Sequence, residues 1–394
     1  MKCHFCGREN IPVVQAEDAV FGHELYICED CAKLALEWLS EQKIEEVKKD
    51  LIVIPKPKEI KEFLDQYIIG QDRVKEKISV AVYNHYKRIL HQNNSDIEID
   101  KSNVLLLGPT GSGKTMIART IAKMLNVPFA IADATVLTES GYVGEDVESV
   151  LVRLYQNADY DVSKTERGIV FIDEIDKIAR KSDNPSITRD VSGEGVQQGL
   201  LKLLEDSIVS IPPKGGRKHP DQPLVQINTK NILFICGGAF VGIDKIIANR
   251  FNKKTIGFNS PTTNKLTDND LMKNITPLDL KKFGLIPEIL GRLPVITYTD
   301  ELDSKTLKRI LIEPKNALVK QYQELFALDG IKLEFKDSAL DMIVEHTINN
   351  KLGARGLRGT MENIMNDAMF NLPSDTSTNE LIIDKKYVKK MLNK

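Results

Sequence analysis

The sequence has no long hydrophobic run and no excess of basic charge. Its apolar runs are short, such as Val104–Leu107 and Ile232–Cys236, and a membrane-spanning helix needs about 20 apolar residues. The first residues, MKCHFCGREN, lack the apolar region of a secretory signal, which predicts a cytoplasmic protein. Lys and Arg number 54 against 56 Asp and Glu, so the basic excess that is usual in nucleic-acid-binding proteins is missing.

Cysteine is scarce, and four of the five cysteines form two CxxC pairs. The pairs are Cys3–Cys6 and Cys28–Cys31, with residues 7–27 between them. Two such pairs bring four thiolates to one tetrahedral site, which is typical of structural zinc. A segment this short also has too small a hydrophobic core to fold without a bound metal ion. We predict a domain at residues 1–50 that binds structural Zn²⁺; the alternative is a pair of redox-active dithiols.

Short apolar strands alternate with helical patterns in the middle of the chain. We expect strands at Val104–Leu107, Pro128–Ala132, Ile169–Ile172 and Ile232–Cys236, and helices at Met116–Leu125 and Asp146–Asn157. This alternation predicts an α/β domain with a parallel sheet flanked by helices. We assign it to residues 61–300, after a proline-containing linker at residues 51–60.

Residues 301–394 have mostly helical periodicity. Helical stretches are expected at Glu301–Asp329, Asp337–Asn349 and Ala354–Asn371, with a short strand pair at Ile331–Phe335 and Glu380–Ile383. A smaller, mostly helical domain should therefore follow the α/β domain.

A complete phosphate-binding motif follows the first predicted strand of the sheet. Residues 108–115 read GPTGSGKT and match GxxxxGK[ST] between a strand and a helix. In this motif the glycines let backbone N–H groups turn towards the phosphates, the lysine reaches the β- and γ-phosphates, and the hydroxyl holds Mg²⁺. The predicted nucleotide-binding residues are Gly108, Pro109, Thr110, Gly111, Ser112, Gly113, Lys114 and Thr115.

Two carboxylates, Asp173 and Glu174, follow the apolar strand at Ile169–Ile172. Together with the upstream phosphate loop, they predict that Asp173 holds Mg²⁺ through water and that Glu174 orients the attacking water. The base-specifying N-K-x-D motif of GTPases does not occur, so ATP is favoured. GxSxG and HExxH are absent as well, so proteolysis would need a separate partner.

Several further motifs accompany the nucleotide site, namely GYVGEDVE, SGEGVQQ, ILFICGGAF, IPEILGRLP and GARGLR. Together with the phosphate loop, FIDEID and the CxxC pairs, they resemble the ClpX family of AAA+ unfoldases over nearly the whole chain. The resemblance implies an ATPase that forms a homo-hexamer. Its substrates would be unfolded or tagged proteins, and it would unfold those that are folded. The resemblance also implies transfer of these substrates through a central pore into the ClpP peptidase, and adaptor proteins that bind the zinc domain.

The resemblance also implies roles for four loops. Tyr142 and Val143 in GYVG match the pore loop that grips the polypeptide, and Arg217, Lys218 and His219 match a basic loop at the pore entrance. Residues 192–198 match a second pore loop. The tripeptide Ile256, Gly257 and Phe258 matches the segment that docks on ClpP, which the sister unfoldase HslU lacks. Without the resemblance, the simpler interpretations are a surface turn for GYVG, a solvated loop for residues 217–219, and a loop packed on its own domain for the tripeptide.

Four further residues complete the implied nucleotide site. Arg292 matches the arginine finger, which reaches the ATP of the neighbouring subunit, and Arg355 matches the second sensor, which contacts the phosphates. Ile68 and Ile69 match the segment that borders the adenine. The family's first sensor is a polar residue at the end of the strand at Ile232–Cys236; here the chain reads Cys236-Gly237-Gly238, and we assign none.

Three classes of function can be compared. The first is a ring-forming, ATP-driven protein unfoldase with no membrane or nucleic-acid partner. The second is an ATP-driven nucleic-acid motor or loader with a zinc segment, against which stand the near-neutral charge and the GYVG loop. The third is a binding module with an inert ATPase core, which the intact Lys114, Asp173 and Glu174 argue against. We favour the first class.

Overall fold

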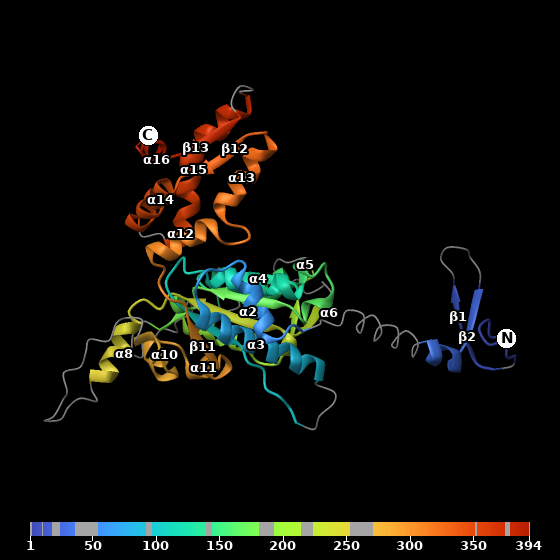
Figure 1. Ribbon diagram of the computed structural model, residues 1–394. Helices are drawn as coiled ribbons and strands as arrows, with labels where there is room; N and C mark the ends of the chain where they lie inside the picture. Colours follow the sequence, from blue (N-terminus) through green and yellow to red (C-terminus); the bar gives the residue numbers. More distant parts are fainter. Residues whose placement is uncertain are drawn as a thin grey trace. The chain divides into compact units, whose positions relative to one another are not determined.

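The computed structural model describes residues 2–9, 11–17, 24–35, 54–91, 97–138, 144–180, 193–213, 224–252, 271–350, 353–374 and 379–393. The chain divides into two compact units, Met1–Val53 and Ile54–Lys394, drawn in Figure 1. Within the described ranges, no helix combines the length and apolar character needed to span a bilayer.

The first unit contains an antiparallel hairpin that the sequence did not lead us to expect. Strands β1 (Val13–Glu17) and β2 (Glu24–Cys28) pair with Val13 opposite Cys28. A helix begins directly after β2, at residue 29. The second CxxC pair therefore spans the junction of β2 with this helix, whereas the first lies in the turn closed by the bridge between Lys2 and Glu9.

The second unit is built on a five-stranded parallel sheet in the order β11-β3-β10-β7-β4. The strands are β3 (Val104–Leu107), β4 (Phe129–Asp133), β7 (Ile169–Asp173), β10 (Leu233–Gly238) and β11 (Val295–Tyr298). Every residue of β3 and β10 is buried, because helices cover both faces of a parallel sheet. Figure 1 shows α4 and α5 over one face and α11 under the other. The predicted α/β class is thus confirmed, and β11 is an additional strand.

Helices and short strands connect these central strands. The helices are α2 (Pro57–Asp65), α3 (Asp72–His91), α4 (Lys114–Leu125), α5 (Ser149–Asn157), α6 (Val162–Thr165), α7 (Glu194–Leu204), α8 (Ile243–Asn252), α10 (Pro277–Phe283) and α11 (Pro287–Arg292), with 3-10 turns η1 (Ile175–Ile178) and η2 (Thr229–Asn231). Two small strand pairs are β5 (Leu137–Thr138) with β6 (Glu145–Asp146) and β8 (Ile208–Ile211) with β9 (Val225–Asn228). Helix α2 begins inside the segment predicted as a linker, because a proline in the first turn favours a helix start.

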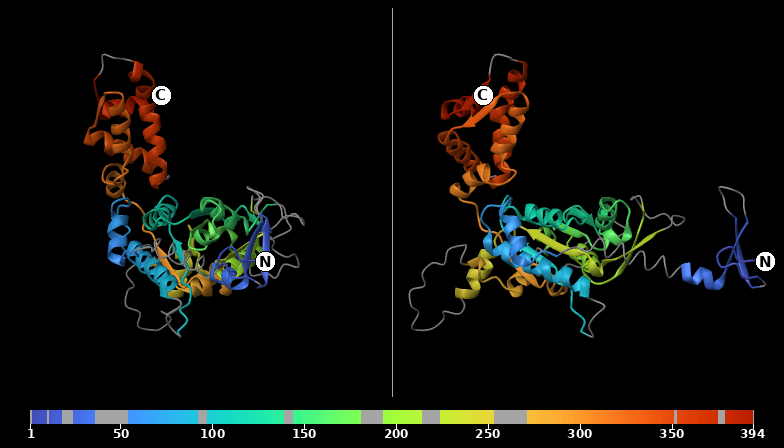
Figure 2. Two further views of the ribbon diagram at one scale, coloured as in Figure 1. Left: turned by 90° about the vertical axis from the view of Figure 1, so that its right-hand side faces the viewer. Right: turned by 45° about the vertical axis from the view of Figure 1, so that its right-hand side comes forward.

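The rest of the second unit is mostly helical, as predicted. It contains α12 (Ser304–Ile312), α13 (Leu318–Leu328), α14 (Asp337–Asn349), α15 (Gly353–Asn371), η4 (Leu372–Ser374) and α16 (Lys385–Leu392). The expected strand pair is present as parallel β12 (Lys332–Phe335) and β13 (Glu380–Ile383), and Figure 2 shows it among these helices. The stretch expected to be helical at Glu301–Asp329 is two helices with Pro314 between them, because proline removes a helical hydrogen bond.

Candidate functional site

The phosphate loop joins β3 to α4 and is held against the end of β11. Gly108 has φ +139, and a Cβ there would lie 1.9 Å from Thr299 Oγ1 and 2.8 Å from the Thr299 carbonyl oxygen, so only glycine fits. The hydroxyl oxygens of Ser112 and Thr299 lie 2.6 Å apart, and Ser112 Oγ also donates to the Pro109 carbonyl at 2.7 Å. Thr299 therefore fixes the base of the loop, although it lies far away in the sequence.

Lys114 places its ammonium group inside this loop. Its Nζ donates to the carbonyl oxygens of Gly108 at 2.6 Å and Pro109 at 2.9 Å. The residue is only 7% exposed, and this burial lowers the pKa of Lys114, against the opposing charge of Asp173. A buried cation beside backbone N–H groups forms a strong site for phosphate. When ATP binds, phosphate oxygens would replace the two carbonyl oxygens as hydrogen-bond acceptors of the Lys114 ammonium.

Thr115 and Asp173 lie next to each other at the expected Mg²⁺ position. Thr115 Oγ1 donates to Asp173 Oδ2 at 3.2 Å, and the backbone N–H of Glu174 donates to Asp173 Oδ1 at 3.0 Å. A hydroxyl and a carboxylate in contact are ligands of the kind that Mg²⁺ takes beside a nucleotide. Glu174 has φ +56 and is exposed. This exposure would let its carboxylate reach a water molecule.

Asp176 and Gly238 explain why no first sensor can be assigned. The Asp176 side chain is 4% exposed, and its Oδ1 accepts from the backbone N–H of Ala239 at 3.0 Å. A Cβ on Gly238 would lie 2.7 Å from that same oxygen and 2.6 Å from the Phe240 ring. The end of β10 therefore has no room for a side chain at this position, because a buried carboxylate from the DEID segment fills the space.

The predicted adenine-side residues form a braced, buried segment after α2. Ile68 and Ile69 are each 7% exposed. The Lys75 ammonium donates to the Ile68 carbonyl and to Asp65 Oδ1, both at 2.6 Å. Gln71 makes a reciprocal pair with the backbone of Asp300: its Nε2 donates to the carbonyl, and its Oε1 accepts from the N–H, each at 2.8 Å.

This reciprocal pair connects the adenine-side segment to the residue where the chain leaves the sheet for α12. A second bond joins the same regions, because the Lys315 N–H donates to the Gln66 carbonyl at 2.8 Å. The sequence motif includes the two isoleucines and Gln71, but it predicts neither Lys75 nor the contact between Gln71 and Asp300. Their partners Asp65 and Asp300 cannot be read from any local motif.

Helix α15 begins beside the phosphate loop. A Cβ on Gly353 would lie 3.2 Å from the carbonyl oxygen of Thr110. Arg355 follows within the first turn of this helix and is exposed. Its charge lowers the pKa of Lys114 further, after the larger effect of burial. Contact of Arg355 with the phosphates stays a prediction.

Arg292, in contrast, pairs with another helix. It is the last residue of α11, and its Nη2 lies 3.1 Å from Oε1 of Glu205, the C-terminal cap of α7. Its side chain is 54% exposed, and its backbone carbonyl accepts from Asn103 Nδ2 at 3.0 Å. The guanidinium is therefore fixed at one nitrogen and accessible to a second molecule.

The four cysteines of the first unit come together. The Sγ atoms of Cys3, Cys6, Cys28 and Cys31 all lie within 4.8 Å of one another, and the sulfurs of Cys6 and Cys28 are 3.7 Å apart. Tetrahedral Zn–S bonds of about 2.3 Å require sulfurs about 3.8 Å apart. The donor set and its spacing therefore fit Zn²⁺ with no open position.

The titration of these thiols also favours a cation. Hydrogen bonds from backbone N–H groups, first that of Cys6, lower the pKa of Cys3 to about 6. The neighbouring sulfur of Cys28 raises the pKa of Cys31 to about 12. The neighbouring sulfurs thus hinder ionisation of Cys31, and a divalent cation would offset this effect, because thiolate is the form that binds metal.

Removing the metal should unfold the first unit. Cys28→Ser leaves three thiolates, and structural zinc contributes about 10–16 kcal/mol to the folding of such segments. We expect about one zinc ion per chain in the unaltered protein, and less than a tenth of that in the variant. Rapid proteolysis within residues 1–53 should accompany the loss, while basal ATP turnover changes less than about threefold.

Metal analysis and limited proteolysis measure these effects. Cys236→Ala is the matched control, because this cysteine lies in β10 and should not affect zinc content. Full zinc content in Cys28→Ser would contradict the assignment of the four cysteines as ligands.

Three sets of predicted residues lie outside the described residues. They are the pore residues Tyr142 and Val143, the basic residues Arg217, Lys218 and His219, and the docking residues Ile256, Gly257 and Phe258. Their roles stay predictions. The second pore loop is described only from residue 193, the N-terminal cap of α7.

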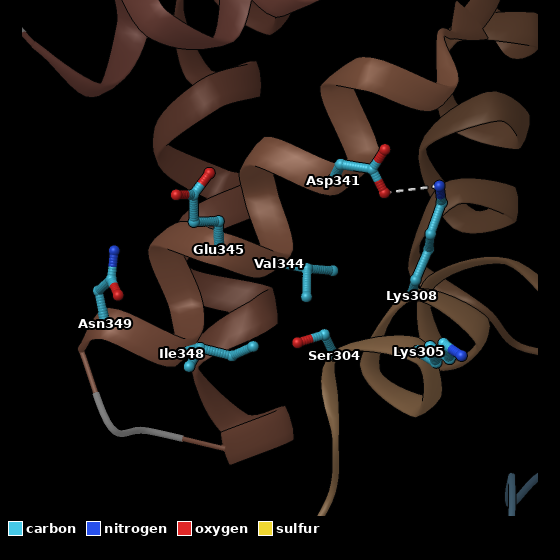
Figure 3. Close-up of a pocket in the computed structure, with 8 residues that line it drawn as sticks. All are labelled: Ser304, Lys305, Lys308, Asp341, Val344, Glu345, Ile348 and Asn349. Carbon is cyan, nitrogen blue, oxygen red and sulfur yellow. Dashed lines mark hydrogen bonds and ion pairs between the residues drawn. The ribbon is translucent and has the colours of Figure 1, made fainter.

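A cavity of about 470 Å³ lies between α12 and α14, and none of the predicted site residues lines it. Figure 3 shows Lys308 and Asp341 facing each other at its side. Lys308 Nζ lies 2.6 Å from Asp341 and 2.8 Å from Asp337, and these hydrogen bonds raise the pKa of Lys308. Since this lysine already binds two carboxylates, we assign no ligand to the cavity.

Comparison with known proteins gives consistent matches along the chain. Residues 99–296 match the AAA domain of the Cdc48 subfamily, and residues 302–383 match the C-terminal D2-small domain of ClpB protein. Proteins named ATP-dependent Clp protease ATP-binding subunit ClpX are similar over nearly their whole length. Those of Porphyromonas gingivalis and Bacteroides thetaiotaomicron are each 57% identical, covering 99% and 100% of this chain and 96% of each relative. That of Bacteroides fragilis is 56% identical over 100% of this chain and 96% of its own length.

Proposed function

Because the chain belongs to the ClpX family of ATP-dependent Clp protease ATP-binding subunits, we propose that it unfolds proteins with the energy of ATP hydrolysis. It is an AAA+ ATPase, and it would pass unfolded substrates to a separate ClpP-type peptidase. One observation carries the proposal: Lys114 lies inside the phosphate loop while Thr115 contacts Asp173 at 3.2 Å. This arrangement supports the proposal, because phosphoryl transfer depends on a cation and Mg²⁺ ligands beside the phosphates.

Each nucleotide-site residue has a chemical role in this proposal. Backbone N–H groups of residues 110–113 and the Lys114 ammonium bind the β- and γ-phosphates. Thr115 and Asp173 hold Mg²⁺, which supplies positive charge against the phosphates. Glu174 orients the attacking water and draws its proton, and Arg355 contacts the phosphates from the first turn of α15. Ile68 and Ile69 provide an apolar wall for the adenine.

ATP binding can be coupled to motion because the site joins two parts of the second unit. The phosphate loop and α15 meet at Gly353, and Gln71 ties the adenine-side segment to Asp300. A ligand that contacts both parts favours one angle between them over another. In a homo-hexameric ring this change would move Tyr142 along a central pore, and Arg292 would complete the site of the neighbouring subunit.

The remaining partners belong to the same proposal. We propose that Arg217, Lys218 and His219 attract acidic groups of a substrate at the pore entrance, and that the zinc segment binds adaptor proteins. The protein would work in the cytoplasm, where reduced thiols can hold Zn²⁺. The proposed domains span residues 1–50, 61–300 and 301–394, and the linker predicted at 51–60 is shorter, because α2 begins at Pro57.

Tyr142→Ala tests the unfolding step. The aromatic ring supplies a large contact surface that grips any polypeptide, and alanine removes it. We expect ATP turnover to stay within about threefold of the unaltered chain, and unfolding of a tagged fluorescent protein to fall at least about tenfold. Tyr160→Ala is the matched control, because it removes an exposed tyrosine without an assigned role. Unimpaired unfolding by Tyr142→Ala would remove Tyr142 from the proposed pore.

Phe258→Ala tests the docking step separately. An apolar side chain that fills a pocket on the peptidase contributes more to binding than the polar residues around it. We expect degradation in the presence of a ClpP-type peptidase to fall at least about tenfold, with unfolding unchanged. Degradation and unfolding are measured on the same tagged protein. Undiminished degradation would show that the tripeptide does not dock.

A further inference from the structure

Helix α7 carries a glutamine in the segment matched to the second pore loop, and no role has been assigned to its side chain. Gln197 is fully buried. Its Nε2 donates to the carbonyl oxygen of Ile178 at 2.8 Å and to that of Gly284 at 3.2 Å, and its Oε1 accepts from the backbone N–H of Ile286 at 2.8 Å. One side chain therefore satisfies backbone groups of two segments that are distant in the sequence.

The two segments connected by Gln197 belong to different functional groups. Ile178 ends η1, the turn that begins directly after Glu174. Gly284 and Ile286 lie just before α11, which ends in Arg292. The segments also contact each other, because the Arg180 N–H donates to the Gly284 carbonyl at 3.0 Å, and a Cβ on Gly284 would lie 2.4 Å from the Arg180 carbonyl oxygen.

The other end of α7 contacts Arg292 itself. Glu205 caps the helix, and its carboxylate lies 3.1 Å from the guanidinium. Between the two ends, Val196, Leu200, Leu203 and Leu204 are buried in the core of the second unit. A helix packed in this way moves as one body, since a close-packed interior deforms little.

We propose that α7 transmits the nucleotide state of a subunit to the arginine that acts on its neighbour's ATP, with Gln197 and Glu205 as positioning residues. The inference depends on the proposed role of Arg292 between subunits. If the turn after Glu174 shifted alone, the buried carbonyl group of Ile178 would lose its hydrogen bond from Gln197, which is costly. Helix α7 and the start of α11 are therefore expected to shift with the turn. Arg292 would then move with the nucleotide state of its own subunit.

Mixed rings of full-length chains test this coupling. Subunits with Glu174→Gln bind ATP without hydrolysing it, and they are mixed in increasing fractions with active subunits. If subunits are coupled, the ATPase rate per active subunit changes with the fraction of inactive neighbours. We expect such a dependence for the unaltered chain, and a constant rate per active subunit, within about 20%, when the active subunits carry Gln197→Met. Methionine matches the length of glutamine but makes none of the three hydrogen bonds.

A matched control separates coupling from general destabilisation. Thr165 is also fully buried, and its hydroxyl donates to the Asp161 carbonyl at 2.6 Å, away from α7. Thr165→Val should keep the dependence of the unaltered chain. The KM for ATP should change less than about twofold in Gln197→Met, because its own phosphate site is intact. An unchanged dependence in Gln197→Met, or none in the unaltered chain, would overturn the inference.

Glu205→Gln keeps the inference testable if the buried substitution prevents assembly. This carboxylate is 43% exposed, so its loss should not affect folding. We expect at least a threefold lower kcat at unchanged KM, and a rate per active subunit that no longer depends on neighbours. Glu288→Gln makes the same chemical change on α11 and should do neither. If Glu205→Gln behaves like Glu288→Gln, α7 does not position Arg292.

The same measurements distinguish this inference from the proposed function. Stimulation of ATP turnover by unfolded polypeptide reports on the unfoldase, whereas the dependence on inactive neighbours reports on coupling. A chain that shows the second without the first would contradict the proposed function and support the role of α7.

Discussion

Glu174→Gln should trap ATP in the site and stop its turnover. Glutamine has nearly the size of glutamate but cannot accept the proton of the attacking water, and general-base catalysis contributes about 10²- to 10⁴-fold. Phosphate release should therefore fall at least about 100-fold. ATP binding should persist within about threefold, because Lys114, Thr115 and Asp173 keep their contacts. Phosphate release and the binding of a fluorescent ATP analogue measure the two effects.

Glu288→Gln is the matched control for this prediction. It neutralises an exposed carboxylate on α11, away from the Mg²⁺ residues, and should leave turnover unchanged. Turnover at the unaltered rate in Glu174→Gln would exclude Glu174 as the residue that activates water, and Asp176, which is buried and bound to Ala239, could not replace it.

Arg292→Ala should lower kcat by about 10³-fold or more, the range found for arginine fingers that act between subunits. The KM for ATP should change much less, because Arg292 pairs with Glu205 and Lys114 lies within the phosphate loop. Stability should change by less than about 1 kcal/mol, since the pair with Glu205 is solvent-exposed. Steady-state ATPase assays at several ATP concentrations separate kcat from KM.

Complementation shows whether Arg292 acts on a neighbour. Rings of Arg292→Ala alone and of Glu174→Gln alone should both be inactive. In a mixture, some sites combine an intact Glu174 with an intact Arg292 from the adjacent subunit, so turnover should return. Arg309→Ala, which breaks an exposed pair with Glu313, is the control and should stay active. A mixture as inactive as its parts would contradict a role between subunits.

The phosphate site could be predicted from sequence because its parts are contiguous. Residues 108–115 supply the loop, the lysine and the hydroxyl in one segment, and Asp173 with Glu174 ends an apolar strand. Likewise, each CxxC pair predicts half of the sulfur cluster. Local spacing determines these features, so a single sequence is sufficient to predict them.

The residues that brace the site were not predictable in this way. Thr299 meets Ser112 across 187 positions, Gln71 meets Asp300 across 229, and Gln197 meets Ile286 across 89. A lone Thr or Gln has no local pattern, since its hydrogen-bond partner is determined by how the sheet and helices pack. Strand β11 was missed because its four residues, VITY, are too few to show a clear period.

Two boundary errors have local physical causes. The sequence pattern places Pro57 in a linker, although proline in a first turn favours the start of a helix. In the stretch expected to be helical at Glu301–Asp329, Pro314 was passed over, and the chain forms two helices there. Both cases show that the position of a proline in an apolar pattern decides whether it begins or interrupts a helix.

We propose that ATP hydrolysis by this chain acts on polypeptide. The most direct measurement is the ATPase rate of the purified full-length protein alone, with an unfolded polypeptide, and with DNA. We expect the polypeptide to raise the rate at least about twofold and DNA to leave it unchanged, since the net charge of −2 offers no general attraction to phosphates. Stimulation by DNA and not by polypeptide would contradict the proposed unfoldase function and favour an ATP-driven nucleic-acid motor.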